Sequence, residues 1–131
     1  MEAHFKAIGT LLIILAATHI FFPIYFNWKN ELQRLSLINK QMMVIHTFFV
    51  ALTVFLIGIL CLTSAKELVE TALGKTISAG CAVFWTCRLA IQFFGYSAKL
   101  WKGKRFETSI HIIFSALWLY LSFVFWINYF H

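Results

Sequence analysis

The fold of this chain is decided by the apolar stretch MMVIHTFFVALTVFLIGILCLT (residues 42–63), which contains no Asp, Glu, Lys or Arg. A bilayer has a hydrocarbon core about 30 Å thick, and one helix needs about 20 apolar residues to cross it. The alternation of apolar and polar residues that is typical of half-buried strands is absent. The stretch therefore predicts a membrane-spanning helix.

Three further runs share this length and character, at residues 5–26, 76–96 and 106–129. The whole chain is 61% hydrophobic and only 12% charged, which is about half the charged share of an average globular domain. A soluble domain of this size could not bury so much apolar surface. We therefore predict an all-α integral membrane protein with one domain, residues 1–131, folded as an antiparallel bundle of four transmembrane helices.

The polar connections predict how this bundle lies in the membrane. Segment 27–41 repeats leucine and isoleucine at helical spacing between basic residues, which predicts a short interfacial helix between spans one and two, with Trp28 as an anchor. Most Lys and Arg residues fall in segments 27–41 and 97–105. The positive-inside rule places these two loops in the cytoplasm and both termini outside a plasma or bacterial inner membrane, with Trp101 as another interface anchor. We interpret the net charge of +6 as a signal for topology and anionic lipid, and not for nucleic acid.

Several polar residues lie inside the expected spans, all toward the basic face. Helical rise places His46 and His111 roughly 6–8 Å below that face, and His19 and Arg88 roughly 10–13 Å below it. Ionisable side chains in a span face the bundle interior, because contact with lipid is costly. The residues expected to converge are His19, His46, Arg88, Gln92 and His111. Tyr96 lies on the same helix face as Arg88, and Glu107 is expected at the entrance of the site, at the membrane surface.

Three histidines on three helices form a ligand set for haem iron or for a transition metal such as Fe, Cu or Zn. Our first hypothesis is a haem b or metal site near the cytoplasmic face that serves electron transfer or redox chemistry. His19 with either His46 or His111 would be the axial pair, and Arg88 would bind the propionates. A single metal ion would use all three histidines, with Glu107 as a fourth ligand or as a carboxylate that hydrogen-bonds to a ligating histidine. The positive charge of Arg88 counts against this version, because it repels a metal cation.

Two other hypotheses need no metal. The same cluster, with Arg88, Gln92 and Tyr96 as its anion-binding or substrate-binding part, could hold a lipid head group, a quinone or a carboxylate substrate. It could also hold the four helices in register within a non-catalytic subunit of a larger membrane complex. His19 has a local alternative, since it could cap carbonyls that are released near Pro23. The expected partners are membrane lipids together with a quinone, a redox protein or a second copy of the chain, and enzymatic activity is left open.

The three cysteines, Cys61, Cys81 and Cys87, show neither a CxxC pair nor the spacing of a zinc site. We interpret them as small apolar residues. A disulfide between Cys61 and Cys81 is the alternative.

Overall fold

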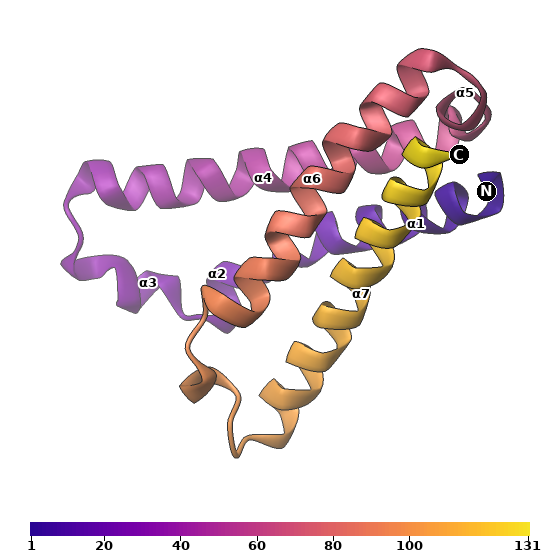
Figure 1. Ribbon diagram of the computed structural model, residues 1–131. Helices are drawn as coiled ribbons and strands as arrows, with labels where there is room; N and C mark the ends of the chain where they lie inside the picture. The colour runs from indigo at the N-terminus through magenta and orange to yellow at the C-terminus, as the bar shows by residue number, and fades with distance from the viewer. The chain divides into compact units, whose positions relative to one another are not determined.

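The chain folds entirely as helices. The computed structural model describes all residues, 1–131, and it is 86% helical with no strands. Two compact units divide the chain, Glu2–Ala65 and Lys66–His131, and each is built on one pair of long helices. The predicted all-α class is confirmed, and each unit is described by itself below (Figure 1).

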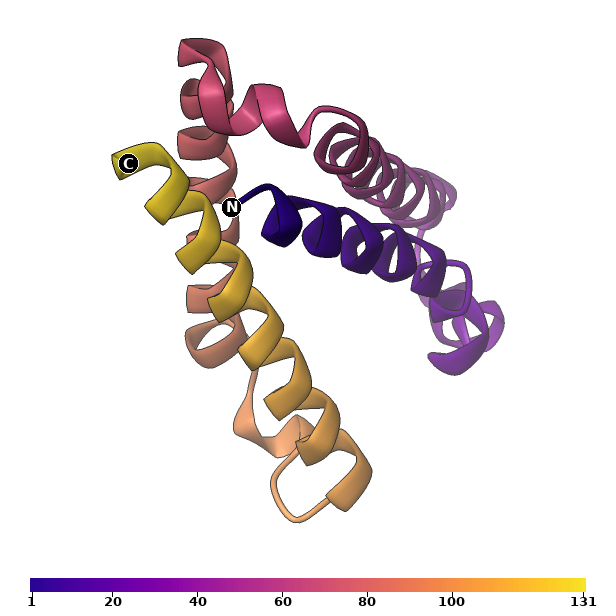
Figure 2. The same ribbon diagram turned by 90° about the vertical axis from the view of Figure 1, so that its right-hand side faces the viewer.

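In the first unit, α1 (Glu2–Thr18) packs along α4 (Leu37–Thr63), as Figures 1 and 2 show. The two helices approach closely at glycine, because a Cβ added to Gly9 would lie only 2.7 Å from the carbonyl oxygen of Gly58. Three short helices join the pair: α2 (Phe22–Tyr25), α3 (Trp28–Glu31) and the 3-10 helix η1 (Leu32–Arg34). The expected interfacial helix at 27–41 is thus divided between α3, η1 and the start of α4.

The first expected span, residues 5–26, is interrupted at residues 19–21. The amide groups there donate to carbonyls three residues back along the chain, as in a tight turn. Pro23 follows in the first turn of α2, and proline lacks the N–H that a continuous helix would donate to the carbonyl of His19. The carbonyl of Leu15, which loses its usual amide partner, accepts a hydrogen bond from the His19 side chain at 2.9 Å.

In the second unit, α6 (Ala72–Phe94) runs antiparallel to α7 (Arg105–Phe130). Cross-helix hydrogen bonds set this register, since Ser78 meets Asn128 near one end of the pair and Gln92 meets Trp118 further along it. The unit also contains the short helix α5 (Ala65–Glu70) before α6, and the 3-10 helix η2 (Ala98–Leu100) between α6 and α7.

Three helices, α4, α6 and α7, are long and apolar enough to cross a membrane. They correspond to the spans predicted at 42–63, 76–96 and 106–129, although α6 ends at Phe94, two residues before the second of these was expected to end. Helix α1 has 17 residues, and at about 1.5 Å per residue it is about 26 Å long, shorter than a hydrocarbon core of about 30 Å. The structure thus fits a helical membrane protein, and the count of four spans stays a prediction.

Candidate functional site

A polar cluster joins the two long helices of the second unit. Arg88 and Gln92 lie four residues apart on α6, so they share one stripe of the helix, and Arg88 Nη1 donates to Gln92 Oε1 at 3.3 Å. Trp118 Nε1 on α7 donates to the same oxygen at 3.1 Å. Gln92 Nε2 lies 2.8 Å from His111 Nδ1, also on α7. Gln92 is 7% exposed, and it connects Arg88 to both residues of α7.

Two aromatic rings complete the surroundings of Arg88. Its guanidinium carbon lies 4.8 Å from the centre of the Trp118 ring and 5.5 Å from that of Tyr96, within the range of a cation–π contact. The Trp118 ring is stacked on the buried Trp85, with 5.2 Å between centroids. Arg88 is half-buried and forms no ion pair with a carboxylate anywhere in the chain. The groups that contact its guanidinium are one amide oxygen and two aromatic rings.

Aromatic rings also hold the imidazole of His111. Trp101, from the connection between α6 and α7, stacks on it with 3.9 Å between centroids and 10° between planes. Phe93 meets it edge to face at 5.7 Å. Gln92 bonds to Nδ1 at the edge of the ring and Trp101 covers one of its faces, so the imidazole is held in one orientation. Its Nε2 has no hydrogen-bond partner within the chain.

His19 and His46 lie in the first unit and share a different local arrangement. His19 Nδ1 is 2.9 Å from the carbonyl oxygen of Leu15, and His46 Nδ1 is 2.8 Å from that of Met42. A backbone carbonyl can only accept, so Nδ1 carries the hydrogen in both rings, and in the neutral ring Nε2 keeps its lone pair. The carbonyl that His19 caps is that of Leu15 and not its own, which is the one that lacks its usual amide partner because of Pro23.

The sequence-predicted residues thus fall into two groups. Those in the second unit form one chain of contacts, from Tyr96 through Arg88 and Gln92 to His111. Glu107 is half-buried in the first turn of α7 and pairs with none of them. His19 and His46 belong to the other unit, so the convergence of both groups stays a prediction.

No group of three or more His, Cys, Asp or Glu residues in the chain could hold a metal ion. A haem clamped by two histidines would not need such a group. The three cysteines differ in burial: Cys61 on α4 is buried, and on α6 Cys81 is half-buried and Cys87 is exposed.

Sequence reasoning missed the tryptophans of this site. Trp101 was expected only as an interface anchor, and Trp118 looks like one more large apolar residue in a helix rich in them. The available signal was spacing, because Trp118 lies seven residues after His111 and therefore on the same stripe of α7.

A second buried polar cluster lies at the other end of the α6–α7 pair. Asn128, 1% exposed, donates from Nδ2 to the Leu68 carbonyl at 2.8 Å and to Ser78 Oγ at 2.7 Å. Lys75 Nζ donates to the Asn128 backbone carbonyl at 2.7 Å, which places a cation at the negative end of the α7 dipole. These contacts fasten α5 and the start of α6 to the end of α7.

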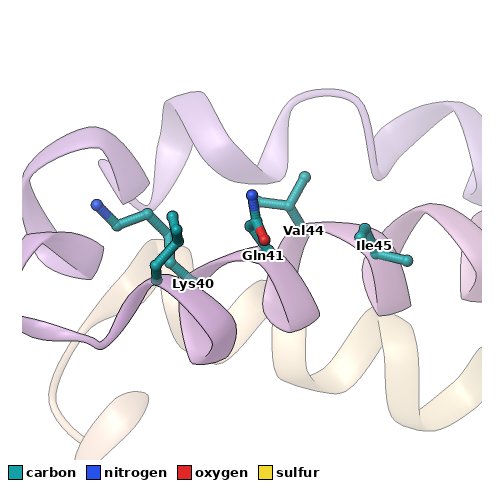
Figure 3. A pocket seen from close by; sticks show the side chains of 5 residues that line it. Lys40, Gln41, Val44 and Ile45 are labelled. Atoms are coloured by element: carbon teal, nitrogen blue, oxygen red, sulfur yellow. The ribbon is translucent and has the colours of Figure 1, made fainter.

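The first turns of α4 line a hollow of about 500 Å³. Its side chains lie along one stripe of the helix (Figure 3). They are Leu37, Lys40, Gln41, Val44 and Ile45. None of the predicted site residues is among them.

Fold and site together define a class: an all-helical protein that has three helices long and apolar enough to span a membrane, with a polar cluster between two of them. No family model, curated protein or solved structure matches the chain.

Proposed function

We propose that the α6–α7 unit contains a metal-free binding site for an anionic or carbonyl-bearing ligand that enters from the membrane, with Arg88 as its anchor. The observation that carries this proposal is the lack of a carboxylate partner for Arg88. Arginine does not lose its proton in proteins. A permanent charge on a membrane-spanning helix needs a counter-charge or water, because contact with lipid is costly.

The remaining groups of the site suit such a ligand. Arg88 uses one N–H for Gln92, so the rest of its fork is available for a bidentate contact with an oxyanion. The rings of Trp118 and Tyr96 flank the guanidinium and would cover the apolar part of a bound molecule. Few, well-placed polar groups among aromatic walls are typical of small-molecule sites.

Native mass spectrometry of the detergent-solubilised protein tests the proposal. Oleate serves as the anionic probe, and oleyl alcohol, which has neither a charge nor a carbonyl group, serves as the matched control and should not be retained. We expect the wild type to retain oleate, Arg88→Leu to lose it, and Arg88→Lys to bind it more weakly, since lysine lacks the planar fork. Lys102→Leu is the matched control, because Lys102 is an exposed cation outside the cluster. Equal oleate retention by wild type and Arg88→Leu would contradict the proposal.

A second candidate function, haem b binding for electron transfer, is favoured by the histidines of the first unit. Both direct Nδ1–H to a carbonyl and leave Nε2 unprotonated, which is the form that binds haem iron. The test is the visible absorption spectrum of the purified protein. A Soret band that shifts on reduction with dithionite, and that His19→Ala or His46→Ala abolishes, would support haem. A colourless protein that is fully folded would contradict it.

For the membrane arrangement, we infer a fourth span formed by α1 and α2 together. We also infer cytoplasmic locations for segments 27–41 and 97–105, with both termini outside. The basic residues concentrated in these two segments support this orientation.

A further inference from the structure

We infer that Gln92 fixes His111 in the tautomer that carries its hydrogen on Nε2, and that the site is thereby selective for an oxyanion, a carboxylate or a phosphate group. The choice of ligand rests on the function proposed above. The tautomer follows from contacts within the α6–α7 unit alone.

The first step is the orientation of the Gln92 amide. Its Oε1 lies 3.3 Å from Arg88 Nη1 and 3.1 Å from Trp118 Nε1. Both nitrogens can only donate. The opposite amide orientation would place the NH₂ group against two donors, so the network itself assigns the oxygen to this side.

The second step follows on the other side of the same amide. Gln92 Nε2 must donate to His111 Nδ1, which lies 2.8 Å away. An acceptor nitrogen carries no hydrogen, so the neutral ring holds its proton on Nε2. The Trp101 ring, stacked at 3.9 Å, keeps the imidazole in this position. His111 therefore presents an N–H group that has no acceptor in the chain.

The third step concerns the hydrogen-bonding groups of the site that have no partner within the chain. The unused groups of the site are the remaining N–H groups of Arg88 and the Nε2–H of His111. Trp85, three residues before Arg88 on α6, has a buried Nε1 with no hydrogen-bond partner. All of these groups are donors. A carboxylate or phosphate can accept from several donors at once and also neutralises Arg88, whereas a hydroxyl or amine group would bring donors of its own.

Nitrogen-15 NMR of the histidine rings tests the tautomer without any ligand. In the labelled wild-type protein we expect the Nε2–H pattern for His111 and the Nδ1–H pattern for His19 and His46, which serve as internal controls. Gln92→Glu offers His111 only an acceptor, so the hydrogen of its neutral ring should move from Nε2 to Nδ1. Trp118→Phe should leave the tautomer unchanged, because Arg88 still orients the amide. An Nδ1–H pattern for His111 in the wild type would overturn the inference.

A ligand titration in the same samples separates the two proposals. Oleate and oleyl phosphate are the carboxylate and phosphate probes, and oleyl alcohol and oleylamine are the matched controls. Either anion should shift the His111 Nε2–H signal, and Gln92→Glu should weaken its binding by about tenfold or more, as expected for losing one charge-assisted hydrogen bond. The expected tautomer without any anion-induced shift would refute the proposed function alone. Anion binding that is equal in wild type and Gln92→Glu would refute the inference alone. Oleyl alcohol binding as tightly as oleate would refute both the inference and the proposed function.

Discussion

Replacing Gly9 with alanine tests how closely α1 and α4 pack. The new Cβ would lie 2.7 Å from the carbonyl oxygen of Gly58 and 2.6 Å from Cγ of Leu62. The leucine side chain can rotate away, but the carbonyl belongs to the hydrogen-bonded backbone of α4. The helices must therefore separate by roughly 0.5 Å, and a gap of that size forfeits about a quarter of the dispersion energy of each contact that it opens.

We expect Gly9→Ala to lower the free energy of unfolding by about 1–3 kcal/mol, the usual cost of adding a methyl group to a filled interface. This loss should appear although alanine favours a helix over glycine by about 1 kcal/mol. Gly80→Ala is the matched control, because a Cβ there would meet nothing within 4 Å. Its stability should be unchanged or higher by up to about 1 kcal/mol.

The assay is reversible unfolding in mixed micelles, with SDS as the denaturant and circular dichroism as the measure of helix content. Gly9→Ala should unfold at a lower SDS fraction than the wild type, and Gly80→Ala should not. If the two alanine variants unfold at the same SDS fraction, the close approach of α1 and α4 at Gly9 is wrong.

Three further predictions concern the second unit and the topology. Asn128→Leu should lower the free energy of unfolding by about 1–3 kcal/mol, because it removes two hydrogen bonds and leaves the Leu68 carbonyl unpaired. Thr53→Val removes only a hydrogen bond within its own helix, so its free energy of unfolding in the same SDS titration should stay within about 0.5 kcal/mol of the wild type. Trp101→Leu should move the NMR signals of the His111 ring protons downfield, because the stacked ring that shields them is lost. Trp28→Leu should leave these signals unchanged. An unchanged His111 signal in Trp101→Leu would contradict the stacking of Trp101 on His111. In a cysteine-free background, an impermeant thiol reagent added outside should label Glu70→Cys and miss Lys102→Cys, and the reverse pattern would overturn the proposed orientation.

The apolar runs predicted the long helices, but not the residues at which those helices begin. Both α4 and α6 begin several residues before the apolar stretches that predicted them. Each begins where a side chain caps the first turn: Ser36 accepts from the amide of Asn39, and Thr71 accepts from that of Gly74. Such caps are visible in sequence, but a count of apolar residues ignores them. The break after Thr18 was likewise signalled by Pro23.

The candidate site was predictable only in part, for a geometric reason. Helical spacing placed Arg88 beside Gln92, because residues four apart share a face. Contacts between helices depend also on the rotation and register of each helix, which periodicity does not determine. The pairing of Gln92 with His111 and Trp118, and the tautomer that follows from it, therefore required the structure.

Contact between Arg88 and a bound carboxylate is the central claim, and a dipolar-coupling measurement tests it most directly. The protein carries ¹⁵N-labelled arginine and binds oleate labelled with ¹³C at the carboxyl carbon, in lipid bilayers. We predict that the carboxyl carbon dephases a guanidinium nitrogen signal in the wild type. We also predict that Arg88→Leu abolishes this effect while Arg105→Leu preserves it. Dephasing that persists in Arg88→Leu, or none in the wild type with oleate in excess, would contradict the account.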